Sequence, residues 1–194
     1  LLVLAFTRPF FRDAETTIVS QPLGEEVVIL VDTSASMRRD GLWVQAVAKT
    51  TAAVDRLEDG DRAAVYTFDA RLTPLMTFSQ WDRLEPSQRG QHIREQLQEI
   101  SPGWQASHLD TALTAAADML QRVDTNRPTA HSERQRIELI SDLQQGSRLD
   151  GLRAYPWPET VQLSLTTIKP QSLTNAGLQI VATPDEQRHS EVAE

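Results

Sequence analysis

The segment VVILV at residues 27–31 constrains the fold more than any other part of the chain. It is a continuous run of apolar, mostly β-branched side chains, which is typical of a strand buried on both faces of a parallel sheet. Two further segments that predict strands follow, AAVYTF at 63–68 and RIELIS at 136–141. We therefore expect a layered α/β fold around a mostly parallel sheet, provided that helices separate the strands.

Helical spacing does appear between these runs. Apolar residues recur every three or four positions in 42–57, in 86–100 and, most clearly, in 109–123. The segment 72–78 follows a short turn. It is expected to form a strand that pairs as a hairpin with the strand at 63–68. Pro74 lies within that segment and favours an edge position, since proline cannot donate a ladder hydrogen bond.

Two further strands are expected towards the end of the chain. Val161, Leu163 and Leu165 alternate with polar residues, which predicts a strand buried on one face only. A further short strand is expected at 178–181.

Composition limits the functional classes. The chain has 194 residues, 27 acidic and 19 basic side chains, a formal charge of −8, and no cysteine. This length fits about one domain. The absence of cysteine excludes a disulfide scaffold and a thiolate metal site. The acidic balance argues against a general nucleic-acid binder, because no basic surplus exists to displace counterions from phosphates.

Polar side chains follow the predicted strands at three places. These are Asp32-Thr33-Ser34-Ala35-Ser36, then Ser107 before the 109–123 helix, and Asp142 directly after the 136–141 strand. Ligands of α/β sheets bind at the carboxyl ends of the strands, so these groups are candidates to converge. Their carboxylates and hydroxyls are hard oxygen ligands that suit Mg²⁺. An ordinary helix N-cap explains each residue taken alone, and it is their joint occurrence at the strand ends that favours a metal site.

These motifs resemble the von Willebrand factor A domain. VILVDTSASM at 28–37 is similar to its first strand and to the Asp-x-Ser-x-Ser part of its metal ion-dependent adhesion site (MIDAS). ASHLDTAL at 106–113 is similar to the stretch that supplies a threonine, a role that Ser107 takes here. ISDLQ at 140–144 supplies the last aspartate. The resemblance implies a three-layer Rossmann-like fold with a mostly parallel sheet and an antiparallel edge strand. It implies these metal ligands: Asp32, Ser34, Ser36, Ser107 and Asp142.

Within this family the chain resembles the bacterial membrane-anchored aerotolerance regulators of the BatA type, both in its apolar start ending in Arg-Pro and in its SDLQ motif. The resemblance implies a non-enzymatic module of the bacterial envelope. The module would bind a partner's Asp or Glu through Mg²⁺, with Mn²⁺ or Ca²⁺ as alternatives. Implied partners are envelope proteins and a MoxR-like AAA ATPase system, and the domain would face outside the cytoplasm.

Domain boundaries follow from the same patterns. Residues 1–23 are expected to be the tail of a membrane helix and a linker, with a short buried segment as the alternative for the apolar LLVLAF. Residues 24–169 form the expected A domain. Residues 170–194 are a C-terminal extension or the start of a following β domain.

Two alternative functions stay open. One is a Mg²⁺-dependent phosphatase with Asp32 as nucleophile, although Ser34 stands where a second acid would be needed. The other is a structural domain with a vestigial metal site. Near the predicted site, Trp104 is interpreted as packed under the sheet, with a partner-contacting rim as the alternative. Arg38 and Arg39 are interpreted as a solvated pair, with steering of an acidic partner as the alternative.

Overall fold

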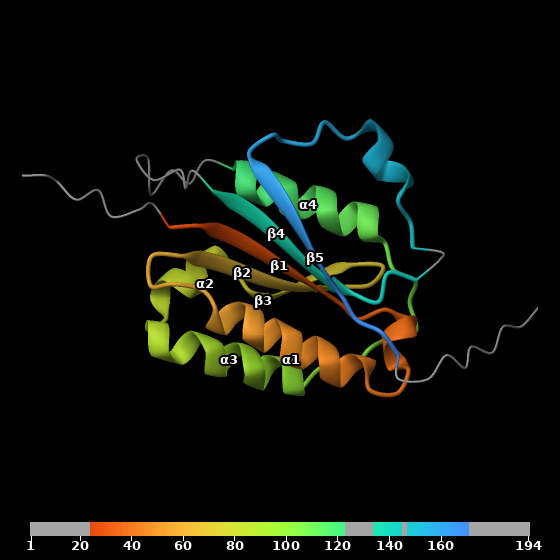
Figure 1. The fold of residues 1–194 in the computed structure, drawn as a ribbon, viewed down its shortest axis with the longest axis horizontal. Helices are drawn as coiled ribbons and strands as arrows, with labels where there is room; N and C mark the ends of the chain where they lie inside the picture. The colour runs from red at the N-terminus through yellow and green to blue at the C-terminus, as the bar shows by residue number, and fades with distance from the viewer. Residues whose placement is uncertain (1–23, 123–133, 145–146, 171–194) are drawn as a thin grey trace, which may run out of the picture.

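A five-stranded sheet organises the part of the protein that the structure describes (Figure 1). The computed structural model describes residues 24–122, 134–144 and 147–170. Strand β1 lies at the centre, parallel to β2 and to β4, and β4 is parallel to β5, whereas β3 runs antiparallel to β2. The mostly parallel sheet with one antiparallel edge strand confirms the predicted fold class. Across the sheet the order is β3 (Leu72–Met76), β2 (Arg62–Phe68), β1 (Glu26–Asp32), β4 (Gln135–Ser141) and β5 (Val161–Thr167).

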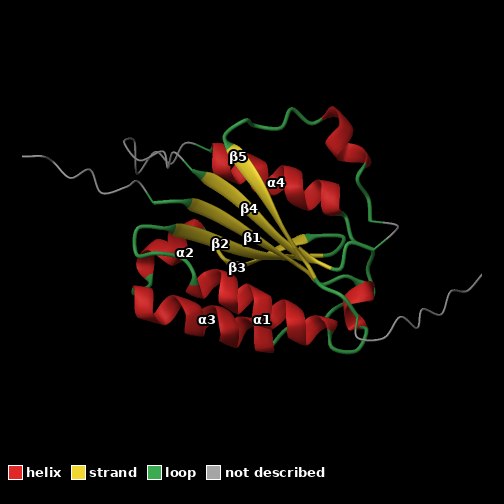
Figure 2. Cartoon of the chain, viewed as in Figure 1, coloured by secondary structure: helices red, strands yellow, loops and turns green. Residues whose placement is uncertain are grey.

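Helices cover both faces of the sheet (Figure 2). Helices α1 (Leu42–Asp55) and α3 (Pro86–Gln98) lie on one face, and α4 (Leu109–Gln121) lies on the other. The short helix α2 (Phe78–Arg83) contacts β2. The result is the three-layer arrangement that the sequence predicts.

The central strand β1 supplies side chains to both cores. Val27, Ile29 and Val31 belong to the core shared with α1 and α3. Val28 and Leu30 belong to the core shared with α4. All five are fully buried, because successive side chains of a strand point to opposite faces and each face is covered by a helix. This burial fixes the position of Asp32 at the end of the strand.

The prediction of a strand over residues 72–78 is wrong at the C-terminal end of that segment. Strand β3 stops at Met76, and Thr77 becomes the N-cap of α2. The Thr77 hydroxyl accepts a hydrogen bond from the Gln80 backbone N–H at 3.3 Å, and the Gln80 side chain accepts one from the Thr77 N–H at 2.8 Å. This capping box satisfies two backbone donors and so favours the helix over further strand. Pro74 does lie on an edge strand, as predicted.

The predicted burial of β5 is also wrong in part. Val161 is buried, but Leu163 and Leu165 are 42% and 54% exposed. Both lie beside buried residues of β4, Ile137 and Leu139. The difference arises because β5 is at the edge of the sheet, where α4 contacts β1 and β4 instead.

Several predicted features fall outside the described residues. These are the apolar N-terminal segment and linker at 1–23 and the strand expected at 178–181. The expected C-terminal extension also lies outside them, apart from its first residue, Pro170. Over the described ranges, no helix combines the length and the hydropathy needed to cross a bilayer.

Helix α4 should show how much the second core contributes to stability. Leu113 is 3% exposed, whereas Thr111 in the same helix faces solvent. Leu113→Ala should lower the free energy of unfolding by about 2–5 kcal/mol through lost burial and the cavity that remains. Thr111→Ala should change it by less than about 0.5 kcal/mol. Urea unfolding measures both, and equal effects of the two substitutions would contradict this packing.

Candidate metal centre

Parallel pairing brings two carboxylates to the same edge of the sheet. Strand β1 ends at Asp32, and its neighbour β4 ends at Ser141, directly before Asp142. The register pairs Val31 with Ile140, so both strands end level with each other. Asp32 and Asp142 therefore meet although 110 positions separate them in the sequence numbering.

Backbone hydrogen bonds attach a third segment to this edge. The Gly103 N–H donates to the Thr33 carbonyl at 2.8 Å, and the Ala35 N–H donates to the Gln105 carbonyl at 2.9 Å. These two bonds fix the loop before α4 against the loop that follows β1. Ser107, two residues further along, is thereby placed beside Asp32.

Asp32 is almost completely buried, with 1% of its surface exposed. Its Oδ1 accepts the Ser34 backbone N–H at 2.8 Å. Its Oδ2 accepts the Ser141 hydroxyl at 2.6 Å and, in a long hydrogen bond of 3.4 Å, the Ser107 hydroxyl. Both carboxylate oxygens therefore have partners.

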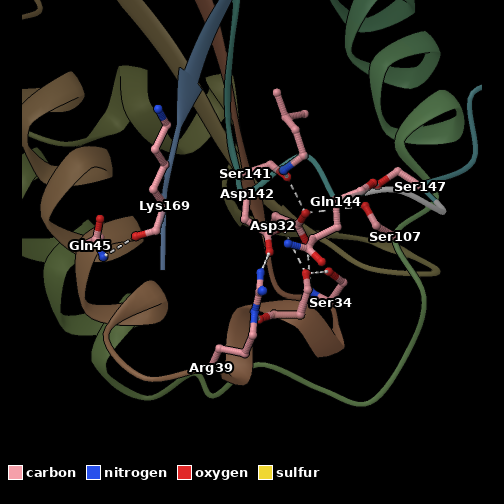
Figure 3. Close-up of polar contacts among 12 residues, drawn as sticks. Asp32, Ser34, Arg39, Gln45, Ser107, Ser141, Asp142, Gln144, Ser147 and Lys169 are labelled. Atoms are coloured by element: carbon pink, nitrogen blue, oxygen red, sulfur yellow. Dashed lines mark hydrogen bonds and ion pairs between the residues drawn. The ribbon is translucent and has the colours of Figure 1, made fainter. Parts of the chain in front are cut away.

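Asp142 is held from the other side of the site (Figure 3). The Ser36 hydroxyl donates to Asp142 Oδ1 at 2.9 Å and lies 3.2 Å from the Ser34 hydroxyl. The predicted site residues thus lie together at one edge of the sheet, each hydrogen-bonded to at least one other site residue. Their role as metal ligands stays a prediction.

Arg39 provides the positive charge of the site. Its guanidinium binds Asp142 Oδ2 at 2.5 Å and donates to the Ser36 carbonyl at 3.2 Å. With the Gln144 amide oxygen turned towards it, that oxygen accepts from the same guanidinium at 2.6 and 3.1 Å. The Asp142 side chain is 1% exposed and that of Arg39 is 24% exposed. The interpretation of Arg39 as a solvated residue is therefore wrong.

Sequence reasoning also missed Ser141 as a site residue. Its hydroxyl donates to Asp32 and accepts the Leu143 N–H at 3.0 Å. Leu143 has a positive φ of 46°, which costs a residue with a Cβ about 1–2 kcal/mol. A hydroxyl at the last position of a buried strand, directly before the predicted ligand Asp142, is the signal that could have identified Ser141.

Burial dominates the electrostatics of Asp32. Desolvation raises the pKa of its carboxyl above the usual 3.8, hydrogen bonds from Ser141 and Ser34 lower it, and the neighbouring Asp142 raises it. The net shift of the pKa is upward, because desolvation is the largest of these effects. A nearby cation would stabilise the charged form of this carboxyl and so offset the cost of its burial.

The residues present fit a hard divalent cation. Two carboxylates and three hydroxyls offer the oxygen atoms that Mg²⁺ prefers. In the part of the chain that the structure describes, no three His, Cys, Asp or Glu side chains gather as a possible metal site. A cation held here would therefore depend on the hydroxyls as well as the two aspartates.

Comparison with known proteins decides the family. The model of the von Willebrand factor type A domain matches residues 27–145, which is more than half of the chain and includes all the site residues. The chain belongs to the von Willebrand factor type A domain family. This confirms the resemblance seen in the sequence. A search of the curated proteins found no match.

Solved structures share the type A fold at low sequence identity. An aerotolerance-related membrane protein from Bacteroides fragilis NCTC 9343 is 18% identical with a TM-score of 0.53, over 88% of this chain and 87% of that one. BatB from Bacteroides thetaiotaomicron is 19% identical with a TM-score of 0.51, over 73% and 65%. The ArnB paralog VWA2 from Sulfolobus acidocaldarius is 20% identical with a TM-score of 0.50, over 73% and 34%. In the last two cases this chain spans less than two thirds of the length of the other protein.

The raised pKa of Asp32 makes the stability of the metal-free protein depend on pH. The folded chain keeps the Asp32 proton to a higher pH than the unfolded chain does, so stability falls as pH rises from 3.8 through the folded pKa. Asp32→Asn removes this titration. In EDTA, the variant should therefore gain stability relative to the wild type over that range and keep the gain at neutral pH.

Urea unfolding at several pH values measures this difference. Asp110→Asn is the control with the opposite sign, because hydrogen bonds led by that from the Gly151 N–H lower the pKa of Asp110. That variant should lose stability relative to the wild type as pH rises through the usual 3.8. A pH-independent difference between Asp32→Asn and the wild type would contradict the account of Asp32.

Proposed function

We propose that this chain is a divalent-cation-dependent protein–protein interaction module. Asp32, Ser34, Ser36, Ser107 and Asp142 would hold Mg²⁺, with Mn²⁺ or Ca²⁺ as alternatives. The partner would contribute an Asp or Glu carboxylate. The observation that carries this proposal is that two carboxylates and three hydroxyls, from three separate segments, gather through hydrogen bonds at the carboxyl edge of the sheet.

The mixture of ligands would let the ion accept a partner carboxylate, because the hydroxyls add no further negative charge. Two aspartates match the charge of a divalent ion, and the three hydroxyls add oxygen atoms without adding charge. When bound, Mg²⁺ would offer a remaining coordination position to an oxygen of the partner. The chain itself positions the ligands. Strands β1 and β4 fix the aspartates, and the backbone hydrogen bonds of Gly103 and Gln105 hold Ser107 in place.

We also propose a setting in the bacterial envelope. Support comes from the likeness of fold to an aerotolerance-related membrane protein and to BatB. In this setting a membrane helix would anchor the domain on the outer side of the cytoplasmic membrane. Its partners would include envelope proteins and a MoxR-like AAA ATPase system.

The phosphatase alternative gains no support from the geometry. A nucleophilic Asp32 would have to reach a substrate, but both of its oxygens accept hydrogen bonds and it is 1% exposed. Ser34, in the position where a second acid is needed, lies against Ser36. A binding role without catalysis therefore fits the site better.

Calorimetric titration with Mg²⁺ and Mn²⁺ tests the metal proposal. The wild type should bind one ion, and Asp32→Ala and Asp142→Ala should each weaken binding by at least about tenfold, since each removes a charged ligand. Thr111→Ala is the control, because Thr111 offers a hydroxyl close in sequence to Ser107 but contacts Asp110 instead. Equal binding heats in all four proteins would show a vestigial site.

Arg39 should compete with the metal for Asp142. Arg39→Gln removes the ion pair to Asp142 Oδ2, so Mg²⁺ affinity should rise by up to about fivefold, which corresponds to the roughly 1 kcal/mol that a partly exposed pair contributes. Arg38→Gln removes the same charge next in sequence without an ion pair to the site and should have a smaller effect. A fall in affinity in Arg39→Gln would show instead that Arg39 holds the site together for the ion.

A further inference from the structure

Trp104 is exposed beside the candidate metal centre. Its side chain is 78% exposed, the most of any large hydrophobic residue among those that the structure describes. The interpretation that it packs under the sheet is therefore wrong. The backbone hydrogen bonds of Gly103 to Thr33 and of Ala35 to Gln105 lie on either side of it. The backbone of Trp104 is thus held next to the loop that carries Ser34, because the residues on both sides of it are hydrogen-bonded to that loop.

Arg38 holds the indole in place from one side. Its guanidinium carbon lies 4.0 Å from the centroid of the Trp104 ring, and its NH1 group donates to the Pro102 carbonyl at 2.8 Å. Arg38 is exposed. Across residues 24–122, 134–144 and 147–170 no carboxylate pairs with it, in contrast to Arg39, which binds Asp142. A positive charge is therefore available next to a flat apolar surface, on a chain whose net charge is −8.

Arg38 also lines a groove that runs along the start of α1. It has a volume of about 270 Å³, which is room for a side chain and not for a helix. Val44, on its wall, is 72% exposed. Among the residues that line it are Arg38, Arg39, Asp40, Trp43, Val44 and Pro102. We call Arg38, Trp104 and this groove the rim surface.

We propose that the rim surface binds an acidic, extended segment of a partner protein. This inference rests on the proposed function, since the same segment would supply the carboxylate to the candidate metal centre. A second carboxylate of the segment would pair with Arg38, and an apolar side chain would lie on Trp104 or in the groove. Arginine and tryptophan are enriched at the residues that dominate binding energy in interfaces. Their existing stack reduces the entropy lost on binding.

A displayed peptide library tests the proposal. Each peptide has one fixed Asp between randomised flanks, and the library is selected against the full 194-residue chain in Mg²⁺. Enriched peptides should carry a further acidic residue and an apolar residue near the fixed Asp. They should bind Arg38→Glu and Trp104→Ala at least about tenfold more weakly than the wild type, the loss expected at a binding hot spot.

Matched variants separate the rim surface from general effects. Trp104→Phe keeps an aromatic face and should retain most of the affinity. Arg83→Glu makes the same charge change at an exposed position on α2, and it should bind like the wild type. In calorimetry with Mg²⁺ alone, Trp104→Ala and the wild type should bind the ion with the same affinity within about twofold. This result would show that the variant is folded and that its metal centre is intact.

The outcomes distinguish the two proposals. Peptides that need Mg²⁺ but bind Trp104→Ala and Arg38→Glu as tightly as the wild type would overturn the rim surface and leave the proposed function standing. Peptides that bind in EDTA and to Asp32→Ala, but not to the rim variants, would support the rim surface and overturn the role of the metal. The same library can also be selected against Arg38→Glu. If peptides are enriched as strongly on that variant as on the wild type, the rim surface is overturned.

Discussion

The parallel pairing of β1 with β4 determines where the polar side chains of this protein meet. Each strand contributes buried side chains to both cores, so neither can shift by one residue without turning apolar side chains away from a core. Asp32 and Ser141 follow the paired residues Val31 and Ile140, and Asp142 comes directly after Ser141, so both aspartates reach the same edge of the sheet. The loop with Ser107 joins them because its backbone bonds to the loop after β1. The site is thus a consequence of strand register, and no single segment forms it alone.

This arrangement concentrates negative charge where it is costly. Asp32 is buried, its described partners are hydroxyls and a backbone N–H, and burial raises the pKa of its carboxyl. Asp142 is also buried, but Arg39 neutralises it. Of the two aspartates at the site, one therefore has a cationic partner and the other would gain from a cation. Leu143, with its positive φ, adds local strain at the same place. Strain and a buried carboxylate with a perturbed pKa are features that the rest of a fold must stabilise, and they often mark functional sites.

Much of the fold follows from patterns within short segments. The apolar run at 27–31 predicts a central strand, and the spacing at 109–123 predicts the helix of the second core, because both patterns report burial directly. The five predicted site residues follow from their positions after strands and from the family motif. The ion pair across the site was not predictable in this way. Arg39 and Asp142 are 103 positions apart, and nothing near either residue indicates the pair. The exposure of Leu165 likewise depends on which strands α4 covers.

The central claim is that the oxygens around Asp32 and Asp142 hold a divalent ion. The most direct measurement is a crystal structure of the chain grown with Mn²⁺, with anomalous diffraction collected at the manganese edge. The account predicts one strong manganese peak among the side-chain oxygens of Asp32, Ser34, Ser36, Ser107 and Asp142. An absence of any peak there, with the Arg39 guanidinium still bound to Asp142, would contradict it.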